Sequence, residues 1–162
     1  MTNLMELIVF GGTALGMALV AGVFLAFSDF VMRALGLARG LAGVEAMQAI
    51  NREVYGSAFL VALLGLAPVA VALGLYAVMR AEGSAAPWFI AGAALYVIGT
   101  VLVTMLGNVP MNKRLDAMAT DAPETLVYWR QYARRWTRFN HLRTLASGLA
   151  AGAFMVGTAL LT

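Results

Sequence analysis

The side chains of this sequence that could bind or transform a small molecule gather between Trp136 and Arg143, directly before the last hydrophobic run. At about 100° per residue, Trp136, Asn140 and Arg143 fall on one face of a helix. An indole can stack on a flat aromatic molecule, and an amide and a guanidinium can donate hydrogen bonds to its oxygen atoms. Because this face leads into an apolar segment, we expect its side chains to point inward.

His141, the single histidine of the chain, is the obvious candidate for a general base, because imidazole changes its charge near neutral pH. On a regular helix it lies about 100° from Asn140 and closer to a second, cationic face. A cationic face is typical of a helix that lies among anionic lipid headgroups. Two interpretations of His141 stay open: a base beside Asn140 and Arg143, or a side chain at the membrane interface. The cationic face carries four arginines: Arg130, Arg134, Arg135 and Arg138.

Three further amides lie next to hydrophobic runs. Asn108 and Asn112 follow the third run, four residues apart, and could point to the same side of a helix end. Pro110 between them distorts that end, because proline has no N–H to donate to the carbonyl four residues earlier. Asn51 precedes the second run. Helix-end asparagines are often caps, so both a binding role and a capping role stay open.

The composition indicates which elements must position these residues. The 162 residues are 62% hydrophobic and 12% charged, which is typical of an integral membrane protein. We expect one membrane domain over residues 1–162, and no cleaved signal peptide, because no Lys or Arg precedes the first run. The predicted class is all-α: a membrane-spanning antiparallel four-helix bundle, with an additional amphipathic interfacial helix before the last span. The spans are expected at about 7–28, 54–79, 87–107 and 142–161.

The basic residues predict the orientation. Three lie in the first connector, six in the third, and Arg143 just beyond it, which makes ten of the eleven Lys and Arg residues. Connectors rich in Lys and Arg face the cytoplasm, so we expect a multi-pass protein of a bacterial-type inner membrane with both termini outside. In this orientation five polar residues flank one membrane face, and we expect them to form one cluster. They are Asn51, Asn108, Asn112, Asn140 and Arg143.

Three motifs precede or follow the runs: AMQAIN, NVPMN and WTRFNHLRT. Together they resemble the anthrone oxygenase family of small four-helix membrane proteins, and the resemblance covers nearly the whole chain. It implies the fold more firmly than the function. The reaction for which the family is named converts an anthrone into an anthraquinone with molecular oxygen, without metal or flavin. The residues most specific to the resemblance are Asn108, Pro110, Asn112, Trp136, Asn140 and Arg143.

The residues are consistent with a reaction that uses no cofactor. The chain has no Cys, one His, no carboxylate within a predicted span and no glycine-rich nucleotide motif, so we expect neither a metal nor another cofactor. A base would remove a proton from an electron-rich substrate, the anion would reduce oxygen, and fixed donors would stabilise the oxyanion. The catalytic candidates are His141, Arg143 and Asn140. The ligand-binding candidates are Asn51, Asn108, Asn112 and Trp136.

A non-enzymatic protein is the competing interpretation. The same cluster would then lock the helix ends in a protein that binds a lipid or quinone-like ligand, or in a helper subunit of a larger membrane assembly. The expected partners are the lipid bilayer, an apolar aromatic or quinone-like small molecule, and a second copy of the chain or another membrane protein. Nucleic acid is not expected, because the basic residues behind the pI near 9.7 flank apolar runs.

Overall fold

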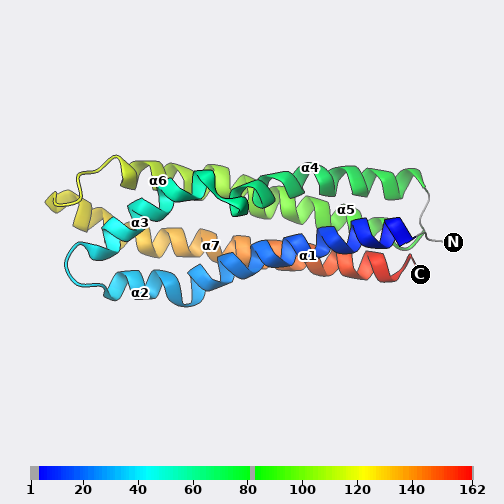
Figure 1. Ribbon diagram of the computed structural model, residues 1–162, viewed down its shortest axis with the longest axis horizontal. Helices are drawn as coiled ribbons and strands as arrows, with labels where there is room; N and C mark the ends of the chain where they lie inside the picture. The colour runs from blue at the N-terminus through cyan, green and yellow to red at the C-terminus, as the bar shows by residue number, and fades with distance from the viewer. Residues whose placement is uncertain (1–3, 81–82, 162) are drawn as a thin grey trace.

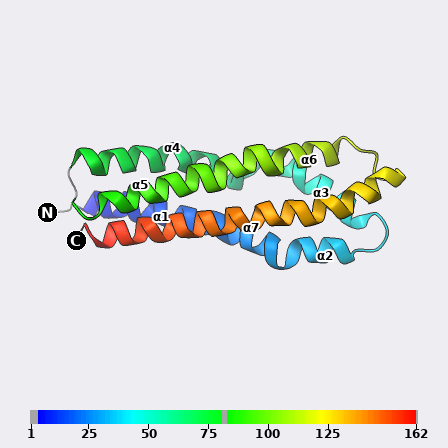
Figure 2. The same ribbon diagram turned by 180° about the vertical axis from the view of Figure 1, so that it is seen from behind.

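Long helices lie side by side in the computed structural model of this protein, which describes residues 4–80 and 83–161 (Figure 1). No strand occurs in these ranges, so the predicted all-α class is confirmed. The start of the first helix and the end of the last lie at the same end of the bundle in both views (Figures 1 and 2).

Four helical segments follow one another along the described residues, and three of them contain a change in helix type. The first consists of α1 (Leu4–Ala26), the π-helical η1 (Phe27–Val31) and α2 (Met32–Leu37). The second consists of α3 (Ala42–Glu53), the 3-10 turn η2 (Val54–Gly56) and α4 (Ala58–Met79). The third consists of α5 (Ala86–Ala94), the π-helical η3 (Leu95–Leu102) and η4 (Thr104–Asn108), and α6 (Val109–Asp116). The fourth is α7 (Pro123–Ala159).

Three of these segments are long and apolar enough to cross a membrane: Leu4–Leu37, Ala58–Met79 and Ala86–Asp116. They contain the first and third predicted spans and most of the second. The chain is therefore a membrane protein with a helical bundle. The fourth predicted span lies in α7, which is not among the three, so its crossing stays a prediction.

The second span begins at Ala58, later than its predicted start at residue 54. Ser57 has an extended backbone, and its Oγ accepts a hydrogen bond from the Leu60 amide at 3.2 Å. This is the geometry of a helix N-cap, and it separates α4 from the 3-10 turn before it. The chain can therefore bend between α3 and α4, and α3 is free to pack elsewhere.

The segment expected to form a separate interfacial helix is instead the first part of α7, which runs unbroken for 37 residues. Its aromatic side chains, Trp129, Tyr132 and Trp136, are buried in a core cluster. The cluster also contains Met47 of α3 and Leu115 of α6. The aromatic face is therefore covered by protein, while the four arginines of the opposite face are exposed, as expected.

Gly43 is required where α2 meets α3. A Cβ added there would overlap the Leu35 carbonyl oxygen, a backbone atom that cannot rotate away as a side chain could. We expect Gly43→Ala to destabilise the protein by about 1–3 kcal/mol, because α3 must move away from α2. Gly36→Ala is the matched control, since a Cβ at that position meets nothing within 4 Å. Thermal unfolding in detergent measures both, and equal melting temperatures for the two variants would contradict this account.

Candidate ligand-binding site

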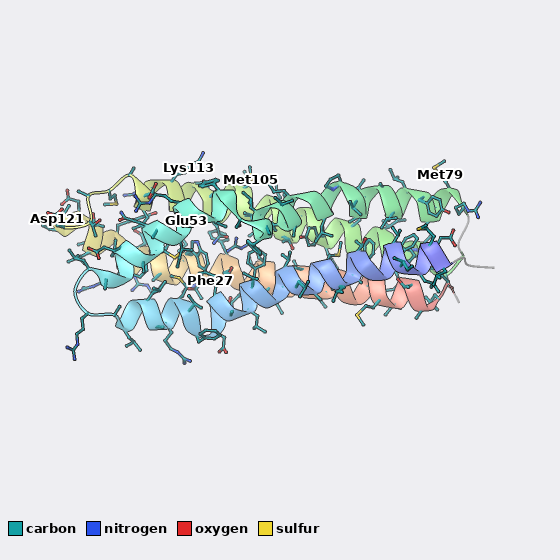
Figure 3. All side chains as sticks on the ribbon, viewed as in Figure 1. Phe27, Glu53, Met79, Met105, Lys113 and Asp121 are labelled. Carbon is teal, nitrogen blue, oxygen red and sulfur yellow. The ribbon has the colours of Figure 1, made fainter. Side chains whose placement is uncertain are left out.

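A cavity of about 340 Å³ opens between the four helical segments, each of which contributes lining residues. It is lined by residues of α1, η1, α3, η2, α4, η4, α6 and α7. Figure 3 labels two of the lining residues, Phe27 of η1 and Glu53 of α3. The volume lies in the lower part of the range found for small-molecule sites. Its wall is mostly apolar and includes Phe24, Leu63 and Trp136.

Arg143 contributes a buried cation to this cavity. The side chain is 5% exposed, and its Nη2 donates a hydrogen bond to Asn140 Oδ1 at 2.5 Å. The guanidinium lies over two rings, 4.2 Å from the centroid of Phe24 and 5.1 Å from that of Trp136. Its Nε has no hydrogen-bond partner, and no carboxylate of the described residues lies within ion-pair distance. A buried cation with an unused donor favours a ligand with an acceptor oxygen.

Asn140 holds Arg143 in place and uses its own polar atoms to do so. Its Nδ2 donates to the Phe24 carbonyl and to Ser28 Oγ, each at 2.6 Å, which joins α7 to the end of α1. Its Oδ1 accepts from Arg143, and the side chain is fully buried. Asn140 therefore has no donor left for a ligand. Its geometry is that of a residue that positions another.

Asn112 and Asn108 fix Trp136. Asn112 Oδ1 accepts two hydrogen bonds, from the Trp136 indole at 2.8 Å and from the Tyr132 hydroxyl at 2.9 Å. Asn108 Nδ2 donates to the Trp136 carbonyl at 3.2 Å, and Asn108 Oδ1 has no partner. Two amides of the third segment thus hold Trp136, one at its indole and one at its backbone carbonyl. The indole is presented to the cavity in a fixed orientation.

Asn51 is the second unused donor of the cavity. The side chain is 4% exposed and lines the cavity, and its Nδ2 makes no hydrogen bond. The Asn51 amide faces the Tyr132 hydroxyl closely enough to oppose a rise in the pKa of that phenol, but the contact lacks the geometry of a hydrogen bond, and the hydroxyl donates to Asn112. Burial raises the pKa of Tyr132, so this phenol stays protonated. An unpaired buried amide costs about 1–3 kcal/mol, which is recovered when a ligand supplies the acceptor.

Of the five residues of the predicted polar cluster, Asn51, Asn112 and Arg143 line the cavity, together with Trp136. Asn108 and Asn140 do not line it, and each is hydrogen-bonded to a residue that does, Asn108 to Trp136 and Asn140 to Arg143. The structure does not bring His141 to them: the imidazole is exposed and does not line the cavity. The reason is the helical offset of about 100° from Asn140, which turns His141 to the outer face of α7. This placement agrees with the interfacial interpretation of His141.

Sequence reasoning missed two contributors to the site. Tyr132 shares the acceptor of Trp136, and its spacing of four residues from Trp136 was the available signal. Glu53 lines the cavity and is the one acidic side chain that does so. It follows Arg52 in a polar stretch, INRE, and nothing in that pattern separates a cavity carboxylate from a solvated one. In residues 4–80 and 83–161, no three His, Asp or Glu side chains come together to hold a metal ion.

A family model described as Anthrone oxygenase matches residues 49–153, about two-thirds of the chain. The matched range contains every residue of the polar cluster and the greater part of α7. No curated protein and no solved structure matches the chain.

Proposed function

The chain belongs to the anthrone oxygenase family, and from this premise we propose that its cavity binds a flat, lipid-soluble aromatic molecule and oxidises it with molecular oxygen. The substrate class is an anthrone, or a phenol or hydroquinone of similar shape. One observation carries the proposal: two buried donors without partners, Asn51 Nδ2 and Arg143 Nε, belong to side chains that line one cavity walled by aromatic rings.

The chemistry of the wall supports this substrate class. Asn51 and Arg143 have donors to spare and therefore select a carbonyl or phenolate oxygen. Trp136, held by Asn112, offers an aromatic face, and Phe24 and Phe27 offer further apolar surface. Such a site discriminates against a hydrocarbon without oxygen, because its buried donors would stay unpaired.

The proposed reaction needs only the substrate and oxygen. Removal of a proton from the methylene carbon of an anthrone gives an enolate, whose oxygen is stabilised by Arg143 and Asn51. The enolate transfers one electron to O₂, and the radical and superoxide combine at the same carbon. After protonation, the hydroperoxide loses water and leaves a carbonyl group. The balance is anthrone plus O₂ giving anthraquinone plus water, with the O–O bond broken and the methylene carbon oxidised.

Glu53 replaces His141 as the proton acceptor in this scheme. Its carboxylate is the one acidic group among the lining residues, and it is exposed at the edge of the cavity, so it can pass the proton to solvent. His141 is on the outer face of α7 and cannot reach a molecule in the cavity without a change in the helix.

We expect Glu53→Gln to lower the turnover number by about 10²- to 10⁴-fold, the usual contribution of a general base. Affinity for the product should change little, since the amide keeps the shape of the carboxylate. Glu45→Gln serves as the control, because Glu45 is an exposed residue of the same helix and does not line the cavity. Oxygen consumption with purified protein and an anthrone measures both variants. Unchanged turnover in Glu53→Gln would remove Glu53 from the mechanism.

We also infer that α7 crosses the membrane over residues 142–159 and that both termini lie outside an inner membrane. The start of α1 and the end of α7 lie at the same end of the bundle, which supports this orientation (Figures 1 and 2). The exposed arginines on the first part of α7 support it as well. Reporter domains fused to the two termini test the orientation. Signals from the cytoplasm at both termini would reverse it.

The reaction itself is tested with purified protein, an anthrone and a supply of oxygen. The expected result is formation of the anthraquinone with one O₂ consumed per product, above the rate of the spontaneous reaction. Saturable binding of the product without turnover would instead identify a binding protein. Neither binding nor turnover with any anthrone, phenol or hydroquinone would contradict the proposal.

A further inference from the structure

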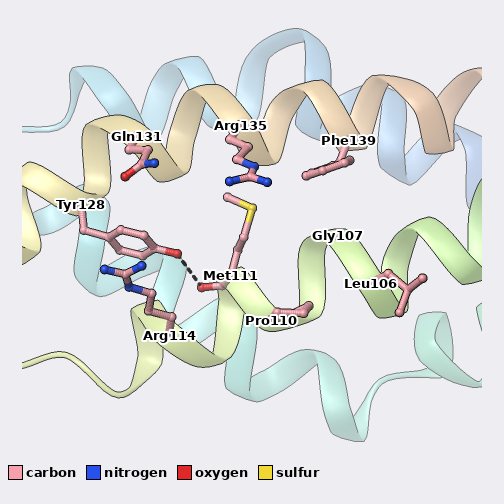
Figure 4. A pocket seen from close by; sticks show the side chains of 9 residues that line it. All are labelled: Leu106, Gly107, Pro110, Met111, Arg114, Tyr128, Gln131, Arg135 and Phe139. Carbon is pink, nitrogen blue, oxygen red and sulfur yellow. Dashed lines mark hydrogen bonds between the residues drawn. The ribbon is translucent and has the colours of Figure 1, made fainter.

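A second hollow, of about 250 Å³, lies between α6 and α7 and shares no lining residue with the first cavity (Figure 4). Two arginines from different helices line it, Arg114 of α6 and Arg135 of α7. Arg114 lies over the Tyr128 ring, with its Cζ 4.3 Å from the ring centroid. Figure 4 shows Arg135 reaching from α7 toward Met111. The two cations therefore belong to one surface depression.

Neither guanidinium is neutralised by the protein. Among the residues that the structure describes, the single ion pair joins Arg52 and Asp116, and no acidic side chain lines this hollow. Gln131 adds an uncharged amide to the lining. The two guanidiniums and the amide NH₂ group can donate hydrogen bonds to a phosphate group, and the guanidiniums also match its negative charge.

The other half of the lining is apolar. Leu106, 72% exposed, belongs to the membrane-length segment Ala86–Asp116, and Phe139 and Pro110 lie beside it (Figure 4). The hollow thus has a cationic end at Arg114 and an apolar end at Leu106, and both residues belong to the third helical segment. A free phosphate would use the first part alone, whereas a phospholipid would use both: its headgroup at the arginines and its acyl chain along Leu106 and Phe139.

We propose that this hollow binds the headgroup of one anionic phospholipid, with Arg114 and Arg135 as its phosphate ligands. The site is fixed by Tyr128, which holds Arg114 against α7 through its ring and donates to the Met111 carbonyl at 3.4 Å. A lipid bound there bridges α6 and α7, the two helices that present Asn112 and Trp136 to the cavity.

The test compares two double variants of the full chain that carry the same change in charge. Arg114→Gln with Arg135→Gln removes the proposed ligands. Lys113→Gln with Arg134→Gln removes two exposed cations, each one residue away from a ligand and outside the hollow. Native mass spectrometry counts phosphatidylglycerol retained by detergent-purified protein, and melting temperature is recorded with phosphatidylglycerol, phosphatidylcholine or inorganic phosphate added.

The parent and the Lys113/Arg134 variant should each retain one phosphatidylglycerol and melt at higher temperature when it is added. The Arg114/Arg135 variant should bind it at least about tenfold more weakly, since each arginine near an anionic lipid contributes roughly fivefold. Equal losses in both double variants would show diffuse attraction and overturn the site. Equal effects of phosphatidylcholine or of inorganic phosphate would overturn the choice of ligand. Arg135→Gln alone keeps the test decisive if loss of Arg114 from the Tyr128 ring disturbs folding.

Discussion

Arg143→Lys should lower turnover of an anthrone by about 10²- to 10³-fold, the effect of removing one donor that stabilises an oxyanion. Lysine keeps the positive charge but lacks the planar fork that donates to Asn140 Oδ1 through Nη2 and leaves Nε for a ligand. A compact ammonium can serve one of these acceptors, not both. Product affinity should fall as well, because the same donor is used in the bound state.

Arg138→Lys is the matched control for this change. Arg138 lies on the same helix and is exposed, and it does not line the cavity. Its substitution should leave turnover and melting temperature unchanged. The proposal fails at Arg143 if both lysine variants retain the activity of the parent, because the guanidinium would then be needed only as a charge.

Asn140→Leu should cause the largest loss of stability, about 3–5 kcal/mol. The change removes the hydrogen bonds that Asn140 Nδ2 donates to Phe24 of α1 and Ser28 of η1, and it leaves the buried Arg143 without its nearest acceptor. Asn51→Leu makes the same replacement at a similarly buried position, but it removes an Nδ2 that has no hydrogen bond. We expect Asn51→Leu to leave stability unchanged or to raise it by about 1 kcal/mol.

Thermal melting of the two leucine variants in one detergent measures this difference. Similar melting temperatures for both would show that Asn140 does not join α7 to α1 as described. A steep loss in Asn51→Leu would show that Asn51 has a structural partner, and the cavity would lose one of its two free donors.

Helical spacing was enough to predict which polar residues meet. Trp136, Asn140 and Arg143 recur every three or four residues, so a helix must place them on one side, and α7 does so. The same spacing rule places His141 on the outer face of α7, away from Asn140 and Arg143. This position agrees with one of the two interpretations that the sequence left open for His141, a side chain at the membrane interface. Apolar run lengths likewise predicted the three helices that are long enough for a membrane.

The roles of the individual amides could not be predicted, because their partners come from distant parts of the chain. Asn140 bonds to Phe24 and Ser28, more than 110 positions earlier, while Asn51 finds no partner for its amide nitrogen. Local patterns carry no information about such pairings. The burial of the aromatic face of α7 could not be predicted for a related reason: this face is covered by α3 and α6, and amphipathic spacing does not tell a protein neighbour from a lipid surface.

The most direct measurement is a titration of purified parent protein and Asn51→Leu with a dihydroxyanthraquinone, followed by its absorbance. We expect saturable binding to the parent and at least about tenfold weaker binding to Asn51→Leu, with a melting temperature that is equal or higher. Such a result separates ligand recognition from folding at a single side chain. Equal affinities in the two proteins, or no saturable binding to the parent, would contradict the claim that this cavity recognises an oxygen-bearing aromatic molecule.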